Sequence, residues 1–593
     1  MQSFRVWAPR AGSVDLLIGE RRAAMAPEPL AGDCSRVGWW QVVVEDAGPG
    51  ARYSYSLDGG PPRPDPRSPF QPDGVDGPSQ VVDHAAFAWS DSNWRGLDLA
   101  AAVLYELHVG TFTPEGTFAS AVAHLDDLAE LGIDAVELLP VAEFDGERGW
   151  GYDGVDLYAP HHSYGGPDGL KCFVDEAHRR GIGVVMDVVY NHLGPSGNCL
   201  AEFGPYFTDR HKTNWGEAVN FDGAFSDEVR RFVVDNALMW LRDYHCDGLR
   251  LDAVHAIFDS SAEHVLEQLA REVGDLASAR GLPYFLIAES DLNDPVFVRS
   301  RAAGGYGLDA AWADEFHHAL HASLTGETRG YYSDFGSPQK LATAMGRAWV
   351  YAGTYSPHRR RVHGRIPRGL SSDKFVVFLQ NHDQVGNRAL GDRIGAQAGE
   401  RLAKVGAALT LLSPFVPMIF QGEEWLASSP FQYFTDHGDK ALGEAVSKGR
   451  REEFASFGWP PEEVPDPQSE VTFAASKLDW VERSREPHSS MLFWYRSLLA
   501  LRHQIRGLTR SDPSCTRTCT GTDAGEEGDW LIVEWPGVVV VANLGLDPVE
   551  ISLPRGGALA LSSDPGVALA GTTVSLPRES VAVVRSFEDR TGI

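Results

Sequence analysis

Cysteine is scarce in this chain, with 6 among 593 residues. The cysteines are scattered, and no two of them form a Cys-x-x-Cys pair. The closest two, Cys515 and Cys519, have no histidine cluster nearby that would suggest zinc. The pattern therefore favours free thiols in a reducing compartment over a disulfide framework.

Long apolar runs and a secretory leader pattern are also missing. No stretch approaches the roughly 18 consecutive apolar residues that a membrane-spanning helix needs. Residues 1–7 show no basic region followed by an apolar one, as a secretory leader would. We therefore expect a cytoplasmic protein without a membrane partner.

Positive charge is in deficit, because 52 Lys and Arg residues face 82 Asp and Glu residues, for a net charge of -30. Such a surface argues against binding to nucleic acid or to anionic membranes through bulk electrostatics. A neutral glycan would be indifferent to it.

The length of the chain suggests two to four domains. Residues 1–90 alternate in short runs broken by Gly, Pro and Asp, which predicts a β-sandwich of the carbohydrate-module type. Residues 91–508 alternate apolar strands with amphipathic helices, which predicts an α/β fold, a (β/α)8 TIM barrel with insertions near 193–225 and 425–485. Residues 509–593 return to short β patterns and predict an antiparallel β domain.

Several elements can be assigned from these patterns. The predicted barrel strands are 103–109, 133–139, 183–189 and 416–420. The predicted helices are 118–131 with its end at Gly132, 170–180, 227–244, 262–280, 398–412 and 491–502. The predicted strands near the carboxyl end are 530–535, 538–543, 549–553 and 580–584.

Three acids, Asp252, Glu289 and Asp383, follow short apolar runs that lie far apart in the sequence. In a parallel barrel the carboxyl ends of the strands converge on one face, so these side chains should meet there. Clustered carboxylates cost electrostatic energy, and glycosyl transfer supplies a reason for them. That chemistry needs a nucleophile, a proton donor with a raised pKa and a group that grips the sugar.

The runs that carry these acids resemble the four signature regions of the α-amylase clan. They are 187–192 (DVVYNH), 248–252 (GLRLD), 288–289 (AE) and 381–383 (NHD), and they occur in the clan's order. The resemblance implies that Asp252 is the nucleophile, Glu289 the general acid and base, and Asp383 a third acid that binds sugar hydroxyls. Arg250 points to the same side of its strand as Asp252 and should hold it ionised.

Further substrate contacts follow from the same resemblance. Residues 151–158 (GYDGVDLY) resemble the clan's substrate-stacking segment, with Tyr152 against the sugar. His192 and His382 resemble the clan's paired histidines, and Asp187 is expected to anchor the His192 loop by hydrogen bonds.

The segment after the nucleophile departs from the clan's calcium-dependent amylases. Their pattern resembles D-x-x-K-H, whereas this chain has Asp252-Ala253-Val254-His255-Ala256. The calcium-binding histidine is replaced by Ala256, so we expect no metal and no cofactor. His255 is expected on the side of the leaving group.

Within the clan, residues 4–585 resemble the maltooligosyltrehalose trehalohydrolase family. The segments that carry the resemblance are 288–295, 312–318, 381–388, 421–425 and 430–437. That family cleaves the α-1,4 bond next to the trehalose end of a maltooligosyl chain and releases trehalose and a maltooligosaccharide. The resemblance therefore implies maltooligosyl trehalose and related α-glucans as substrates.

The leaving-group pocket is expected from residues that follow the sixth strand, Asp314, Glu315, Phe316 and His317, and Trp215 is expected to stack on a glucose ring. The full set of candidate substrate-binding residues is Tyr152, His192, Trp215, Arg250, His255, Asp314, Glu315, Phe316, His317, His382, Gln384 and Asn387.

Two alternative functions remain open on the sequence. A glucan debranching or branching enzyme would share the sandwich and barrel layout. A non-catalytic glycan-binding protein would have lost its acids, and the presence of Asp252, Glu289 and Asp383 argues against it.

Overall fold

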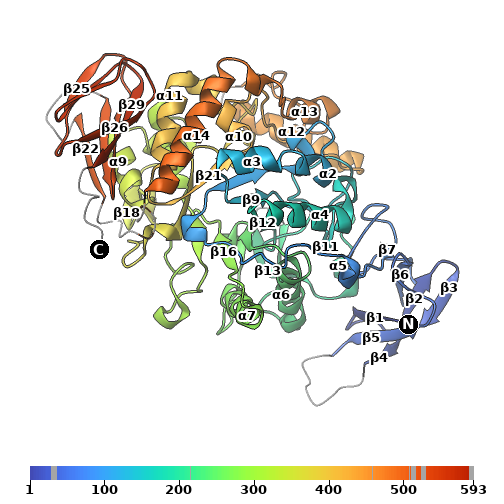
Figure 1. The fold of residues 1–593 in the computed structure, drawn as a ribbon. Helices are drawn as coiled ribbons and strands as arrows, with labels where there is room; N and C mark the ends of the chain where they lie inside the picture. The colour runs from blue at the N-terminus through green and yellow to red at the C-terminus, as the bar shows by residue number, and fades with distance from the viewer. Residues whose placement is uncertain are drawn as a thin grey trace.

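A closed barrel of eight parallel strands forms the middle of the computed structural model (Figure 1). The structure describes residues 1–28, 37–213, 216–456, 459–505, 508, 510, 516–521 and 529–586. Antiparallel sheets from the two ends of the chain, blue and red in Figure 1, lie on opposite sides of the barrel. The predicted fold class is confirmed.

The barrel strands are short, apolar and buried over their whole length, as expected for parallel strands covered by helices. In chain order they are β8 (Leu104–Leu107), β9 (Ala135–Leu138), β12 (Gly183–Val188), β15 (Gly248–Leu251), β16 (Phe285–Ala288), β17 (Ala310–Trp312), β20 (Phe375–Phe378) and β21 (Val416–Phe420). Strand β21 pairs with β8 and closes the barrel. It has the bounds predicted from the sequence.

Helices connect most of these strands. The longer ones, with α3 between the first two strands, are α3 (Leu125–Leu131), α4 (Gly166–Arg179), α6 (Ser226–Arg242), α7 (Val265–Arg280), α8 (Asp314–Thr325), α11 (Ile394–Leu411) and α14 (His488–Gln504). The connection from β16 to β17 is described throughout and carries only the short 3-10 helix η5 (Arg301–Ala303). None of the helices in the described part of the chain is both long and apolar enough to cross a lipid bilayer.

The helix predicted over 118–131 is broken in two. It forms α2 (Phe118–Val122) and α3, with His124 between them in a non-helical conformation. The His124 ring stacks on Trp480, with ring centroids 3.7 Å apart, and its Nδ1 lies 3.1 Å from Asp127 Oδ2. The contact with Trp480 joins residues that are far apart in the sequence, so the local pattern could not predict the break in the helix. The predicted end at Gly132 is confirmed, because that glycine adopts a φ of 100° as the left-handed cap of α3.

The first residues of the chain form two small antiparallel sheets. Their strands are β1 (Gln2–Trp7), β2 (Val14–Ile18), β3 (Arg21–Ala24), β4 (Ala26–Pro27), β5 (Trp39–Val44), β6 (Arg52–Leu57) and β7 (Ser79–Gln80). Trp7 packs edge-on against Tyr206 beside the barrel. Arg67 donates to Tyr158 Oη and Asp235 Oδ2 at 2.8 and 2.9 Å, which ties these sheets to α6.

Two further antiparallel sheets follow α14. Their strands are β22 (Arg517–Thr520), β23 (Trp530–Trp535), β24 (Val538–Asn543), β25 (Val549–Ser552), β26 (Gly557–Ser562), β27 (Ala568–Ala570), β28 (Thr573–Leu576) and β29 (Ser580–Ser586). The bounds of β23 and β24 are those predicted. Trp535 Nε1 donates to Met345 O on helix α9 (Pro338–Arg347) at 3.4 Å, which is a contact between these sheets and the barrel domain.

The remaining elements lie in the connections between barrel strands, except for the last two, which lie between β21 and α14. They are α1 (Val109–Phe112), β10 (Ala142–Glu143), β11 (Asp156–Pro160), α5 (Leu200–Phe203), β13 (Phe207–Thr213), β14 (Gly216–Val219), α9 (Pro338–Arg347), β18 (Thr354–Ser356), β19 (Arg361–His363), α10 (His382–Gly386), α12 (Lys440–Ser456) and α13 (Glu470–Ala475).

Two adjacent acids are buried just after strand β21. Glu423 accepts hydrogen bonds from Tyr495 Oη at 2.9 Å and Gln380 Nε2 at 3.1 Å, and Tyr105 Oη donates to Glu424 at 3.0 Å. Burial raises the pKa of Glu423 to about 8 and that of Glu424 to about 7. Both carboxyl groups therefore hold protons in the folded protein at pH values where the unfolded chain has lost them.

The free energy of unfolding should fall as pH rises because of this pair. Between the ordinary pKa of 4.5 and the folded value of about 8, Glu423 binds a proton in the folded state only. Its contribution to stability is complete below the unfolded pKa and is lost as pH rises through the folded one, with a slope of up to about 1.4 kcal/mol per pH unit. Glu423→Gln should flatten this slope in denaturant titrations from pH 5 to 8. The exposed control Glu444→Gln should leave it unchanged, and an equal slope in all three proteins would contradict the prediction.

Candidate active site

Arg250 lies at the centre of an acid cluster, which we define as Asp187, Asp252 and Glu289. Its guanidinium is fully buried and contacts all three carboxylates. Nη1 lies 2.7 and 2.6 Å from the two Asp187 oxygens and 3.1 Å from Asp252 Oδ1, and Nη2 lies 2.9 Å from Glu289 Oε2. The acids lie in or just after β12, β15 and β16, so one cation joins three neighbouring barrel strands.

Asp252 directly follows β15 and is held on both oxygens. Asn191 Nδ2 donates to Oδ2 at 2.7 Å, and Arg250 binds Oδ1. Burial raises the pKa of Asp252, whereas Arg250, Asn191 and a hydrogen bond with Glu289 act in the opposite direction. The contact between the two carboxyl groups requires a shared proton. Asp252 accepts on both of its oxygens, whereas both donors to Glu289, the Ala253 amide and Arg250, meet Oε2 and leave Oε1 to carry the proton.

Glu289 follows β16 and accepts a hydrogen bond from the Ala253 amide at 2.7 Å. Ala253 has φ 40° and ψ 51°, a left-handed conformation that is costly for a residue with a Cβ. This strained conformation places the Ala253 amide within hydrogen-bond distance of Glu289. Burial raises the pKa of Glu289, the Asp252 charge adds to the rise, and Arg250 opposes it. A carboxyl group with a raised pKa keeps its proton to higher pH and can act as an acid.

Asp383 lies in the first turn of α10, beside the same cluster. Its Oδ1 accepts from Asn387 Nδ2 at 2.6 Å, and the N-cap residue Asn381 accepts from the Gln384 amide at 2.8 Å. Burial raises the pKa of Asp383, His382 lowers it, and the Glu289 charge raises it further. The effect of the Glu289 charge on the pKa of Asp383 indicates that the third predicted acid lies near the other two.

Tyr152 and His382 form a stacked pair next to Arg250. Their ring centroids are 5.1 Å apart with 19° between the planes, and Tyr152 Oη donates to Asp187 Oδ2 at 2.6 Å. Glu106 accepts from the His382 amide at 2.8 Å and lies 2.6 Å from its Nδ1. Burial alone would lower the pKa of His382, but the Glu106 carboxylate raises it above its ordinary value. Asp187 thus supports the site through Arg250 and Tyr152.

His192 lies behind Tyr152. Its Nε2 is 3.0 Å from Tyr152 O, and its Nδ1 is 2.5 Å from Asn191 Oδ1. Burial lowers the pKa of His192, so its ring is neutral near pH 7. These contacts place His192 between the segment that carries Tyr152 and the Asn191 that binds Asp252.

Four further residues are predicted to bind substrate, and two of them, Asp314 and His255, are expected on the side of the leaving group. Asp314 begins α8, and burial raises its pKa well above the ordinary value, with Glu289 and Asp383 adding to the shift. Gln384 Oε1 accepts from Tyr331 Oη at 3.2 Å, and Asn387 binds Asp383. His255 is exposed and interacts electrostatically with Asp291.

Three predicted pocket residues lie elsewhere, which corrects the expectation for them. Glu315 Oε2 accepts the amides of Val350 and Tyr351, both at 2.7 Å, and anchors that loop. Phe316 is fully buried in the hydrophobic core. His317 is 2% exposed, with Nδ1 2.7 Å from Leu379 O and Nε2 3.0 Å from Tyr332 Oη. Trp215 lies outside the described residues.

Sequence reasoning missed other members of the site. Glu106 orients His382 across 276 positions of sequence, and the Trp312 ring lies 4.2 Å from the Arg250 guanidinium carbon. Asn191, which binds Asp252, is a further member that the sequence did not single out. The sequence contains one signal for Glu106. A glutamate inside the apolar run 104–107 must face either solvent or the barrel interior, which makes it a candidate site residue.

Comparison with known proteins identifies the family. The family model "Alpha amylase, catalytic domain" matches residues 85–215. A malto-oligosyltrehalose trehalohydrolase from Arthrobacter ramosus is 52% identical over 94% of this chain and 95% of its own. One from Rhizobium sp. (strain M-11) is 47% identical over 98% of this chain and 97% of its own. The chain belongs to the malto-oligosyltrehalose trehalohydrolase family.

Solved structures share the fold of this chain. A crystal structure of an α-amylase candidate from Salmonella typhimurium is 39% identical, with a TM-score of 0.87, over 98% of this chain and 97% of that one. The pullulanase from Bacillus acidopullulyticus, at 18% identity and a TM-score of 0.70 over 98% of this chain and 73% of that one, shares the fold. Membership of the malto-oligosyltrehalose trehalohydrolase family makes the chain a glycoside hydrolase.

Proposed function

We propose that this chain hydrolyses the α-1,4-glucosidic bond next to the terminal trehalose of malto-oligosyltrehalose and releases trehalose and a maltooligosaccharide. The observation that carries the proposal is the acid cluster around Arg250, in a chain 52% identical to a protein named for that activity. A cluster of this composition suits retaining glycosyl transfer.

In the first step Asp252 attacks the anomeric carbon of the glucose that precedes trehalose. The bond from that carbon to the trehalose oxygen breaks, and Glu289 gives its proton to the departing oxygen. Trehalose leaves, and the maltooligosyl chain is held as an ester of Asp252. The raised pKa of Glu289 supports the donor role, and Arg250 and Asn191 support Asp252 as the anion.

In the second step Glu289, now ionised, takes a proton from water. The resulting oxygen nucleophile attacks the same carbon and displaces Asp252. Two inversions leave the anomeric configuration unchanged, and both carboxyl groups return to their starting protonation states.

Asp383, Tyr152 and His382 are proposed to hold the glucose ring that reacts. The stacked pair offers an aromatic face, and Asp383 offers an acceptor for sugar hydroxyls. Arg250 is proposed to set the charge of Asp252 and His192 to fix the Tyr152 segment.

Asp314, His255, Gln384 and Asn387 are proposed to face the trehalose unit. The proposal is best supported for Asp314, because its carboxyl group interacts electrostatically with both Glu289 and Asp383. A polar site built for trehalose loses partners when a plain maltosyl end occupies it, so it should discriminate between the two substrates.

Asp314→Asn should lower kcat/KM for malto-oligosyltrehalose by roughly tenfold more than for a maltooligosaccharide of equal length. Tyr152→Phe, on the glycosyl side, should lower both values by similar factors. Steady-state kinetics on the two substrates test this. A ratio near one in the unmodified enzyme would favour a general α-glucan hydrolase, and product analysis on amylopectin would then test debranching or branching.

A cytoplasmic location is also proposed. Cys172, Cys199 and Cys246 are free thiols within the described part of the chain, which suits a reducing compartment. Cell fractionation with immunodetection tests it.

A further inference from the structure

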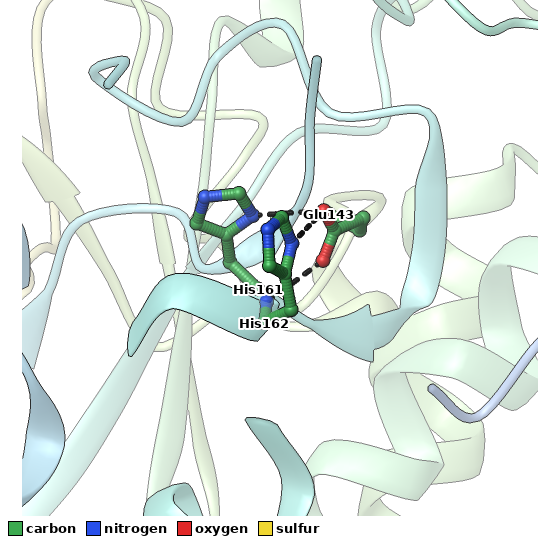
Figure 2. Close-up of side chains that lie close together, drawn as sticks. All are labelled: Glu143, His161 and His162. Carbon is green, nitrogen blue, oxygen red and sulfur yellow. Dashed lines mark hydrogen bonds and ion pairs between the residues drawn. The ribbon is translucent and has the colours of Figure 1, made fainter. Parts of the chain in front are cut away.

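Two histidines and a glutamate converge away from the acid cluster, at the base of the hairpin that carries Tyr152. Glu143 ends β10, His161 directly follows β11, and His162 begins the 3-10 helix η3 (His162–Tyr164). Figure 2 shows the two imidazole rings side by side, each with a nitrogen directed at the Glu143 carboxylate. The antiparallel pairing of β10 with β11 brings the three residues together.

One oxygen of Glu143 meets both rings. Its Oε1 lies 3.0 Å from His161 Nδ1 and 2.6 Å from His162 Nδ1, and the three candidate ligand atoms all lie within 4.8 Å of one another. The side chains of Glu143 and His161 are 0% exposed, whereas that of His162 is 21% exposed. The cluster is therefore buried with one side toward solvent.

His161 carries the strongest sign that something is missing from this cluster. Its imidazole is fully buried. Within the described part of the chain Nε2 has no hydrogen-bond partner, and Nδ1 meets Glu143 as an ion pair without hydrogen-bond geometry. Leaving a buried polar group unpaired costs free energy, so such groups are rare. Nδ1 nevertheless faces a buried carboxylate at 3.0 Å. A cation between them would satisfy both.

Each candidate ligand is held through atoms that a metal would not use. Glu143 Oε2 accepts the His162 amide at 2.8 Å, and His162 Nε2 lies 3.1 Å from Glu147 Oε1. The His161 amide donates to Val141 O at 2.7 Å, and its ring stacks on Phe144 at 3.9 Å. A histidine that gives its second nitrogen to a carboxylate is the usual arrangement around bound metals.

We propose that Glu143, His161 and His162 bind one divalent transition-metal ion, with Zn²⁺ as the best match. Two imidazoles and a carboxylate suit Zn²⁺, which binds such ligands at about 2.0–2.2 Å in a tetrahedral shell. Ligand atoms in such a shell stand roughly 3.3 Å apart. To reach this spacing, the separation from Glu143 Oε1 must open by about 0.3 Å for His161 and about 0.7 Å for His162. The exposed edge of His162 leaves the fourth position to water.

The ion holds the base of the hairpin rather than taking part in hydrolysis. Residues 144–155 connect β10 to β11 and include Tyr152, which binds Asp187 in the acid cluster. Fixing both ends of that segment fixes the stacked pair of Tyr152 and His382. Zinc should therefore raise thermal stability and extend activity at elevated temperature, while the activity at moderate temperature changes little.

The test uses the full chain, stripped with a chelator and titrated with Zn²⁺ by calorimetry, with bound metal counted by mass spectrometry after gel filtration. We expect one Zn²⁺ per chain and a Tm higher by several degrees with metal. Co²⁺ in place of Zn²⁺ should give the visible absorption of a tetrahedral site.

Variants separate this site from adventitious binding. Glu143→Gln and His162→Gln should each weaken Zn²⁺ binding by at least about 100-fold, and Glu147→Gln by roughly 10- to 100-fold. His503→Gln removes an exposed histidine outside the cluster and should change nothing. His162 is partly exposed, so His162→Gln keeps the test valid if Glu143→Gln does not fold. Absence of stoichiometric binding in the unmodified chain, or equal binding in the His162 variant, would overturn the proposal.

Discussion

Asp252→Ala should reduce turnover of malto-oligosyltrehalose by at least about 10⁴-fold, because the first step then has no attacking group. The fold should persist, since Arg250 keeps Asp187 and Glu289 as partners. Single-turnover assays and far-UV circular dichroism measure the two effects.

Chemical rescue sharpens this test. With an activated glycosyl fluoride, azide can enter the space left by the carboxylate and should form a glycosyl azide of inverted configuration. More than a few per cent residual activity, or an azide product of retained configuration, would rule out Asp252 as the nucleophile.

Glu289→Gln should cost roughly 10³- to 10⁴-fold on malto-oligosyltrehalose, because an amide cannot protonate the trehalose oxygen. A glycosyl fluoride needs little protonation, so formation of the Asp252 ester from it should fall far less. The unmodified enzyme should lose kcat/KM as pH rises through the raised pKa of Glu289, and the variant should lose this basic limb. Equal losses on both substrates would count against the acid role. Asp314→Asn is a matched control that removes a nearby carboxylate and should keep the limb.

Local patterns were sufficient to predict the frame of the molecule. The strand at 416–420 is a run of buried apolar residues that any parallel sheet would require, and it formed as predicted. The acids at 252 and 289 could be placed because the ends of barrel strands converge whatever the loops do. These features depend on hydrophobic periodicity and on strand topology, and both can be inferred from local sequence patterns.

The failures concern which way a side chain faces. Successive residues on α8 are turned by about 100°, so Asp314 and Phe316 point to opposite sides, and only the first reaches the acids. The Glu315 carboxylate does not reach the site, because it accepts hydrogen bonds from the loop amides of Val350 and Tyr351. Contacts of that kind join residues more than 30 positions apart and leave no local trace.

The contacts of Arg250 have a consequence for what the site prefers to hold. One guanidinium faces the carboxylates of Asp187 and Asp252 while Glu289 holds its proton, and a neutral glucan brings no charge to balance the remaining negative charge. The oxocarbenium-like glucosyl unit midway through the reaction is the one species in the cycle that does. The excess negative charge of the resting site is therefore balanced only when the oxocarbenium-like unit forms. This balance stabilises the transition state more than the bound sugar. A stable cationic analogue of the sugar should therefore bind tightly to this site and inhibit the enzyme.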